Sequence, residues 1–199
     1  MNLVESYHER FAFSPPEAFS KLCGNGSEIV WPRLPGFEWF GAEGIQQFEF
    51  LDHQWDDFVP FGRNAAGDLW CWWPNETKDG RVPVVVCPID CEEGEVYAPD
   101  FSSGLFRLVC DTVREMSLHP SGVASARRLA ADCEHFTVAL WPSAWVEFLQ
   151  SFATRPISKW IHRGQVHTGL LSEEAYHQLM EQWIDDGNVG TVFRWMTSP

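Results

Sequence analysis

The chain has 199 residues, of which 45% are apolar and eleven are tryptophan. This apolar content excludes an intrinsically disordered chain, because enough side-chain area can be buried to offset the entropy lost on folding. The chain carries 28 Asp and Glu against 14 Lys and Arg. The resulting net charge of −14 argues against nucleic acid as a partner.

No apolar run approaches the roughly 18 residues of a membrane-spanning helix. The longest runs are Val82–Cys87 and Phe136–Trp141, and the first ten residues lack the basic and then apolar order of a signal peptide. We therefore expect a cytoplasmic protein with no membrane partner. The sequence does not indicate an oligomeric state.

The negative charge is concentrated in the first half of the chain. Residues 1–100 hold 18 acidic and 6 basic residues, whereas residues 101–199 hold 10 and 8. An acidic half steers basic partners toward itself. The alternative is that the charge only keeps a tryptophan-rich chain in solution, and the sequence leaves both interpretations open.

Residues 14–24 predict a first short helix, with Ser14 as N-cap, Pro15 at the first helical position and Gly24 past its end. The Gly- and Pro-rich stretch 25–43 predicts an irregular connection. Between residues 44 and 100, apolar runs separated by turn residues predict strands. These are Ile45–Phe50, Asp57–Phe61, Leu69–Trp73, Val82–Cys87 and Glu95–Ala98. Their spacing leaves no room for crossover helices, so we expect antiparallel pairing.

After Asp100 the apolar period becomes helical. The predicted helices are Phe101–Met116, Ser125–Trp141, Pro142–Phe152 and one that begins after Ser172, while Arg155–Gly169 and Asn188–Trp195 are compatible with strand or loop. Strands followed by helices predict an α+β fold, with a central, mostly antiparallel sheet flanked by helices. We expect a single domain over 1–199, with a core at about 12–116 and a helical extension at about 121–199.

Gly62 and Gly67 have the Gly-x4-Gly spacing of a phosphate-binding loop. Asp68 and Leu69 occupy the positions where such a loop needs Lys and Ser or Thr, so phosphate would be repelled. We predict instead a tight turn between two strands, in which Gly67 takes a positive φ and Asp68 bonds the turn backbone.

Six cysteines are scattered along the chain, at positions 23, 71, 87, 91, 110 and 133. We expect them to be reduced and buried, in apolar or acidic surroundings that raise the thiol pKa. Cys87 and Cys91 are the one close pair, whereas zinc usually needs two such pairs. The histidines form no His-Glu-x-x-His motif, and no Gly-x-Ser-x-Gly elbow is present. The sequence therefore predicts a protein that is not an enzyme, with no catalytic residue, metal or cofactor.

The tryptophans are divided between two predicted roles. Those at 70, 72, 141 and 145 are expected in the core, and those at 31, 39 and 55 are candidate interface anchors, because tryptophan is enriched in binding hot spots.

The segment from Trp55 to Trp72 carries a recognisable order of residues: an apolar pair, Pro, an apolar residue, Gly, a polar turn, Gly-Asp and an aromatic strand. The matching positions are Val59, Pro60, Phe61, Gly62, Gly67, Asp68, Leu69 and Trp70. This order resembles the central motif of the SUKH (Smi/Knr-like) superfamily, and the resemblance extends over about residues 12–116. The family closes its first helix with Asn-Gly, which here has a counterpart only in Gly24–Gly26.

The resemblance implies an α+β domain without catalytic residues, often used as a bacterial immunity protein that neutralises a toxin domain, commonly a nuclease. The acidic charge agrees with a basic toxin as the protein partner. The expected contact residues lie in two acidic segments that contain no Lys or Arg. They are Glu49, Asp52, Trp55, Asp56 and Asp57 in the first segment, and Asp90, Glu92, Glu93, Glu95 and Asp100 in the second.

Two other hypotheses remain open. A regulatory or scaffold protein of the same fold would have no toxin partner. An enzyme or metal protein would use Cys87 and Cys91.

Overall fold

The computed structural model describes residues 2–23, 26, 32–51, 56–137, 140–162 and 164–196, without the side chains of 134–137 and 162. The chain forms two compact units. Unit 1 comprises Met1–Gly104 and Asp185–Pro199, and unit 2 comprises Leu105–Ile184. Residues 185–199, which the sequence grouped with the helical extension, thus return to unit 1. No helix among the described residues is long and apolar enough to cross a membrane.

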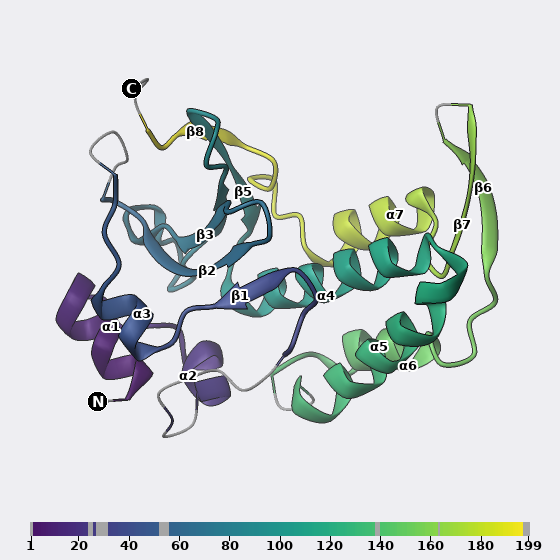
Figure 1. Cartoon of the computed structure of the whole chain (residues 1–199), viewed down its shortest axis with the longest axis horizontal. Coiled ribbons are helices and arrows are strands. Elements are labelled where there is room, and N and C mark those ends of the chain that lie inside the picture. Colours follow the sequence, from purple (N-terminus) through teal and green to yellow (C-terminus); the bar gives the residue numbers. More distant parts are fainter. Residues whose placement is uncertain are drawn as a thin grey trace. The chain divides into compact units, whose positions relative to one another are not determined.

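Unit 1 is built on a six-stranded antiparallel sheet in the order β1-β2-β3-β4-β5-β8 (Figure 1). The strands are β1 (Phe37–Trp39), β2 (Val59–Asn64), β3 (Leu69–Trp72), β4 (Val84–Cys87), β5 (Glu93–Ala98) and β8 (Val192–Arg194). A 3₁₀ turn, η1 (Pro74–Glu76), follows β3. The α+β class and the antiparallel pairing predicted from the sequence are confirmed.

The predicted strand Ile45–Phe50 is wrong, because part of it belongs to helix α3 (Ala42–Gln46). Ala42 and Ile45 are both buried and lie three residues apart, so they share one helical face. The remaining residues, 47–50, pair with no strand. The sequence also missed β1, which lies within the stretch predicted to be irregular.

Two further helices belong to unit 1. In α1 (Leu3–Phe11) the Asn2 side chain accepts from the Glu5 N–H at 2.9 Å, and the Glu5 carboxylate accepts from the Asn2 N–H at 3.0 Å. This capping box satisfies two N–H groups that the first turn leaves free. Helix α2 (Glu17–Cys23) confirms the predicted first helix but begins at Glu17, after Ser14 and Pro15.

Trp72 occupies the centre of the unit 1 core and is fully buried. Five aromatic rings lie within 6 Å of its ring, from Tyr7, Phe13, Phe19, Phe61 and Phe101. Phe101 opens helix α4 (Phe101–Ser117). Helices α1, α2 and α4 and the sheet therefore meet in one aromatic cluster, in agreement with the core role predicted for Trp72.

The C-terminal segment completes the sheet. Phe193 lies across Gly94 of β5, where a Cβ atom would stand 2.7 Å from the Phe193 ring. Trp195 is fully buried, and its indole N–H donates to the Cys91 carbonyl at 2.7 Å.

Unit 2 is helical, with one hairpin. Besides the rest of α4 it contains η2 (Pro120–Gly122), α5 (Val123–Thr137), α6 (Ser143–Ser151), α7 (Glu173–Trp183) and the two-stranded sheet β6 (Ser158–His162) and β7 (Gln165–Gly169) (Figure 1). The Phe106 ring stacks on Trp145 at 4.6 Å and meets Trp141 edge-on at 5.3 Å. The Ser172 hydroxyl accepts from the Ala175 N–H and caps α7, as predicted.

Candidate functional site

The glycine-rich segment that resembles a phosphate loop is the turn between β2 and β3. Gly67 has a φ of +95°, as predicted. The Asn64 side chain accepts from the backbone N–H groups of Ala66 and Asp68, at 2.9 and 3.0 Å. The Asp68 carboxylate instead accepts from the Asn64 amide at 2.8 Å and from the Ile89 N–H at 3.2 Å. Asp68 therefore ties this turn to the β4–β5 turn, and Asn64 performs the role that the sequence assigned to Asp68.

The other motif residues lie inside the sheet. Gly62 lies so close to β1 that a Cβ atom would stand 2.6 Å from the Phe37 ring and 2.8 Å from the Glu38 carbonyl oxygen. Pro60 is buried beside a break in the β2–β3 register, where its missing N–H does little harm. The ring of Trp70 packs edge-on against Tyr97 at 4.3 Å. These positions shape the sheet and present no reactive group.

All six cysteines are free, and Cys91 alone among them is exposed. Burial raises the pKa of the Cys23 thiol to about 12, and it raises the pKa values of Cys71, Cys110 and Cys133 as well. These four thiols stay protonated at neutral pH, and the buried state predicted for the cysteines is confirmed for all except Cys91. Within the described part of the chain, no three His, Cys, Asp or Glu side chains are arranged to hold a metal ion.

The strand register places Asp56 and Asp57 of the first acidic segment away from Asp90 and Glu92 of the second. Val59 of β2 pairs with Trp72, and Val84 pairs with both Trp72 and Ala98, so these residues form one end of the sheet. Asp56 and Asp57 directly precede this end of β2. Leu69 pairs with both Arg63 and Cys87 at the opposite end. Asp90 and Glu92 belong to that opposite end, because they lie between Cys87 and the start of β5.

The first segment borders an open hollow of about 670 Å³. Its lining includes three carboxylates, from Glu9 of α1, Glu49 and Asp56, together with the Arg10 side chain. The Arg10 guanidinium is already engaged, because it donates to the Phe48 carbonyl at 2.8 Å through Nη2 and at 3.3 Å through Nε. We call this site the acidic hollow. Among the described residues that line it, carboxylates outnumber guanidinium groups by three to one.

Asp57 lies outside the acidic hollow. Its carboxylate accepts from the Asn75 side-chain amide at 3.2 Å. Asp52, Trp55 and Trp31 fall outside the described residues. The Trp39 indole donates to the Pro32 carbonyl at 2.7 Å, and its ring lies 5.9 Å from Phe61. Trp39 is therefore half-buried and held by these contacts, and its role as an interface anchor stays a prediction.

The second segment is partly neutralised by a residue distant in sequence. Arg194 of β8 lies 3.4 Å from the Glu92 carboxylate. Asp90, Glu93 and Glu95 are exposed. The Asp100 carboxylate accepts from the N–H and the hydroxyl of Ser103, at 2.8 and 2.9 Å, and so caps the first turn of α4. This capping role accounts for Asp100 without any contact to a binding partner.

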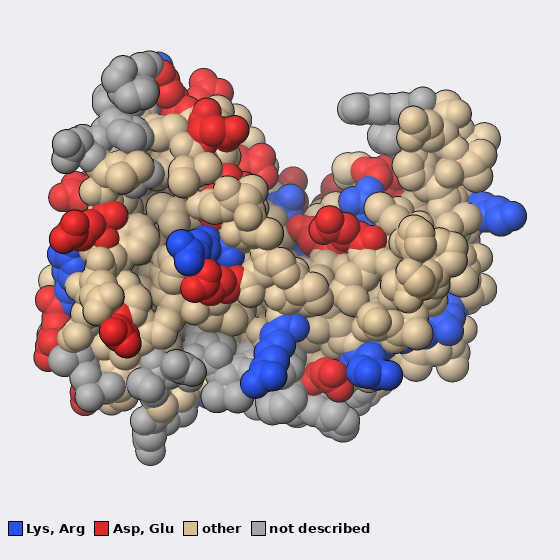
Figure 2. All heavy atoms as spheres, viewed as in Figure 1, with Lys and Arg blue, Asp and Glu red and all other residues tan. Residues whose placement is uncertain are grey.

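The charge is divided between the units more sharply than between the halves of the chain. Unit 1 contains 20 Asp and Glu against 7 Lys and Arg, a net charge of −13, while unit 2 contains 8 against 7. On the face that Figure 2 shows, acidic side chains are scattered and do not form one continuous patch. In the acidic hollow three described carboxylates converge on one concave site.

Sequence reasoning missed Glu9, because it did not predict α1. The signal was present: Asn2 followed three residues later by Glu5 is the pattern of a capping box. Comparisons with protein-family models, with curated proteins and with solved structures found no match. The site is therefore interpreted from its own geometry.

Proposed function

We propose that this chain is a non-catalytic protein-binding domain that binds a basic protein partner through the acidic hollow. The partner we favour is a bacterial toxin domain, neutralised by this chain in the manner of an immunity protein. The observation that carries the proposal is the convergence of Glu9, Glu49 and Asp56 on one hollow whose Arg10 is engaged by a backbone carbonyl.

The hollow suits a Lys or Arg side chain from a partner. Glu9, Glu49 and Asp56 are exposed, so each carboxylate can accept a new hydrogen bond without first losing a buried one. A hydrogen bond between charged groups is stronger than one between neutral groups. The net charge of −13 on unit 1 adds a longer-range attraction, which speeds the encounter with a basic surface and weakens as salt is added.

The choice of a toxin domain rests on the resemblance of residues 55–72 to the SUKH motif, together with the acidic charge. A nuclease is a suitable target, because its substrate-binding surface is positively charged and a cluster of carboxylates can occupy it. The scaffold or regulatory role stays the alternative function for the same fold.

The test uses the purified full-length chain as bait in a lysate of its source organism at low salt, with bound proteins identified by mass spectrometry. Binding of a recovered partner is then measured by calorimetry with the wild-type chain and with a hollow variant, Glu9→Gln/Glu49→Gln/Asp56→Asn. We expect a basic toxin domain whose binding to the variant is weaker by about tenfold or more.

A matched control removes the same number of carboxylates from exposed positions of unit 2, in the variant Glu115→Gln/Glu174→Gln/Glu181→Gln. A third variant, Asp90→Asn/Glu93→Gln/Glu95→Gln, tests the second acidic segment. The hollow assignment is wrong if the three variants bind equally well. A recovered partner that is not basic and binds equally well at low and high salt would contradict the toxin proposal. It would favour the regulatory role.

A further inference from the structure

A second cavity, of about 470 Å³, opens in unit 1 between β5 and β8 on one side and the connection from β3 to β4 on the other. Small-molecule sites in proteins commonly occupy about 300–1,000 Å³. The cavity shares no lining residue with the acidic hollow. We call it the β5–β8 cavity.

One end of the β5–β8 cavity is aromatic. The rings of Trp73 and Phe193 lie 4.5 Å apart, and Phe58 packs behind both, at 5.5 and 5.2 Å. Phe58 is buried, whereas Trp73 and Phe193 are only partly covered. Two partly covered rings beside Val96 and Val192 give an apolar ligand group a surface on which to pack.

The other end is charged, and a hairpin of the backbone fixes the charges. Lys78 and Arg81 exchange backbone hydrogen bonds of 3.0 and 2.9 Å. Between them Asp79 and Gly80 both have positive φ, +52° and +74°. Asp-Gly in this conformation is the favoured two-residue hairpin turn, so Lys78 and Arg81 stand side by side at the cavity.

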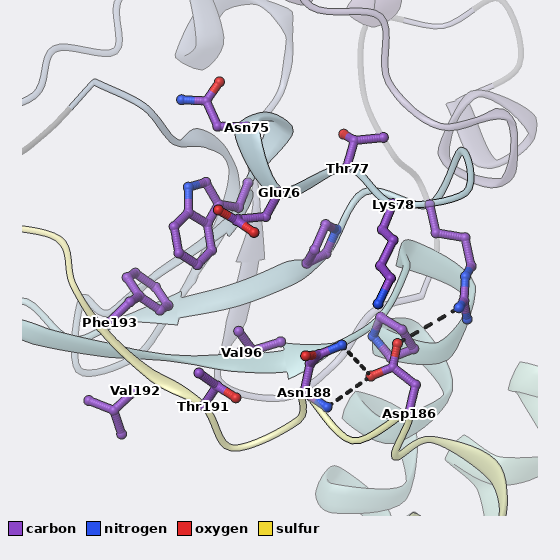
Figure 3. Close-up of a pocket in the computed structure, with 14 residues that line it drawn as sticks. Asn75, Glu76, Thr77, Lys78, Val96, Asp186, Asn188, Thr191, Val192 and Phe193 are labelled. Atoms are coloured by element: carbon purple, nitrogen blue, oxygen red, sulfur yellow. Dashed lines mark hydrogen bonds and ion pairs between the residues drawn. The ribbon is translucent and has the colours of Figure 1, made fainter.

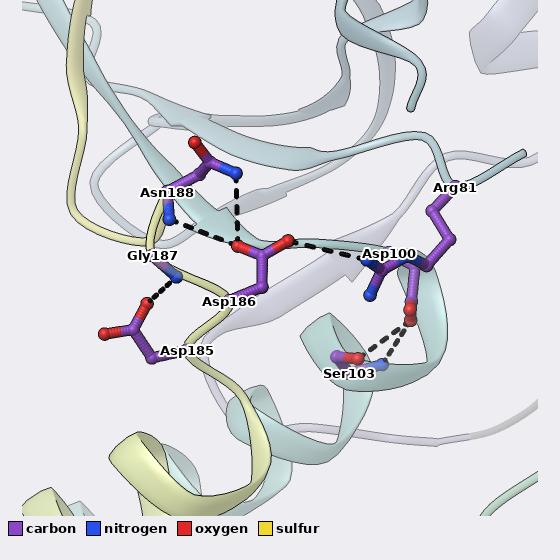
Figure 4. A network of polar contacts seen from close by, with 7 residues as sticks. All are labelled: Arg81, Asp100, Ser103, Asp185, Asp186, Gly187 and Asn188. Atoms are coloured by element: carbon purple, nitrogen blue, oxygen red, sulfur yellow. Dashed lines mark hydrogen bonds and ion pairs between the residues drawn. The ribbon is translucent and has the colours of Figure 1, made fainter. Parts of the chain in front are cut away.

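Two of the four charged residues that line the cavity are already engaged. The Asp186 carboxylate accepts from the N–H and the side-chain amide of Asn188, at 3.2 and 3.4 Å, and it lies 3.8 Å from the Arg81 guanidinium (Figure 4). These contacts hold the 185–190 loop against the hairpin. The other two, Glu76 and Lys78, have no side-chain hydrogen bond or ion pair with any residue that the structure describes.

Figure 3 shows Glu76 and Lys78 on one side of the cavity, with Val96, Asp186 and Asn188 on the facing side. A carboxylate and an ammonium are thus both available beside an aromatic surface. The net charge of −13 on unit 1 disfavours nucleotides and other polyanions. A zwitterion has no net charge, and each of its ends finds the opposite charge in the cavity.

We propose that the β5–β8 cavity binds a free α-amino acid with an aromatic or large branched side chain. Its carboxylate pairs with the Lys78 ammonium, its ammonium pairs with the Glu76 carboxylate, and its side chain packs on Trp73 and Phe193. This inference does not depend on the proposed protein partner.

The test is isothermal titration of the purified full-length chain with L-phenylalanine, N-acetyl-L-phenylalanine and L-phenylalaninamide. The first analogue lacks the ammonium and the second lacks the carboxylate. We expect L-phenylalanine to bind, and each analogue to bind about two- to fivefold more weakly, as for the loss of one partly exposed ion pair.

Variants assign each charge to its residue. Lys78→Ala should weaken the binding of L-phenylalanine about as much as the loss of the ligand carboxylate does. It should leave the binding of L-phenylalaninamide unchanged. Glu76→Gln should weaken the binding of L-phenylalanine about as much as the loss of the ligand ammonium does. It should leave the binding of N-acetyl-L-phenylalanine unchanged. Lys21→Ala and Glu43→Gln, at exposed positions outside the cavity, are the matched controls and should bind like the wild type.

The proposal is overturned if L-phenylalanine, L-tryptophan and L-leucine all fail to bind. It is also overturned if L-phenylalanine binds equally well to Lys78→Ala, Glu76→Gln and the wild type. Thermal melts of every variant verify folding, and because all four substituted side chains are exposed, none is expected to lower the melting temperature appreciably.

Discussion

At the residue scale, some glycines of unit 1 occupy positions that do not tolerate a larger residue. Gly62 and Gly94 are both covered by an aromatic ring from the neighbouring strand, and in both a Cβ atom would also meet a carbonyl oxygen at 2.7–2.8 Å. A backbone oxygen cannot move aside as a side chain can. Gly67 is constrained differently, by its positive φ. The spacing that resembles a phosphate loop thus arises from one packing constraint and one conformational constraint.

The substitution Gly62→Ala should lower the free energy of unfolding by about 1–3 kcal/mol, because the new methyl group overpacks the contact with β1. Urea denaturation followed by circular dichroism measures the change. The control is Gly44→Ala in α3, where the nearest atom is 3.9 Å away. It should raise stability by about 0.5–1 kcal/mol, since glycine is unfavourable inside a helix. Equal stability of Gly62→Ala and the wild type would refute the close approach.

At the element scale, β8 shows how a three-residue strand is held in place. Its pairing with β5 is short, and isolated pairings of this length are unstable in water. Two aromatic side chains, one in the strand and one directly after it, hold it in place. Phe193 packs against Trp73 and Phe58, and Trp195 buries its indole and donates to the Cys91 carbonyl. The charged end of the β5–β8 cavity depends on the same segment, because Asp186 and Asn188 precede the strand.

Replacing Trp195 by alanine should lower the free energy of unfolding by about 3–5 kcal/mol, because a large buried ring is removed. Trp195→Phe keeps most of the ring area and removes the N–H donor, so it should cost less, about 1–3 kcal/mol. Urea denaturation followed by circular dichroism gives both values. If the two variants were equally stable, the hydrogen bond and not the packing would be the main contribution.

At the scale of the whole molecule, the two units differ in charge by far more than in size. Unit 1 carries nearly all of the net charge, at −13, and unit 2 is close to neutral. Like charges on one compact unit repel each other, and this repulsion lowers the stability of the folded state. A partner with basic side chains would relieve that repulsion on binding.

The melting temperature should therefore rise between about 0.02 and 0.5 M NaCl, over which the Debye length falls from about 20 to about 4 Å. The hollow variant Glu9→Gln/Glu49→Gln/Asp56→Asn should melt higher than the wild type at low salt and respond less to added salt. The unit 2 variant Glu115→Gln/Glu174→Gln/Glu181→Gln should respond like the wild type. A melting temperature independent of salt would argue against charge repulsion in unit 1.

The sequence by itself determined the fold class, the antiparallel pairing, most strands and the helices after residue 100. It also located the β2–β3 turn and the core role of Trp72. Each of these depends on local signals, namely the apolar period of 2 or 3.6 residues, turn residues and helix caps. At Ile45–Phe50 the sequence predicted a strand, whereas Ile45 and Gln46 belong to α3.

The tertiary structure alone decided the rest, because the remaining features join residues that are far apart in sequence. Glu9 meets Glu49 and Asp56 around one hollow, Arg194 neutralises Glu92, and residues 185–196 return to unit 1. Strand register also separated Asp56 and Asp57 from Asp90 and Glu92. The charge of each segment can be read from composition, whereas their positions depend on hydrogen-bond pairing between strands, which no local pattern encodes.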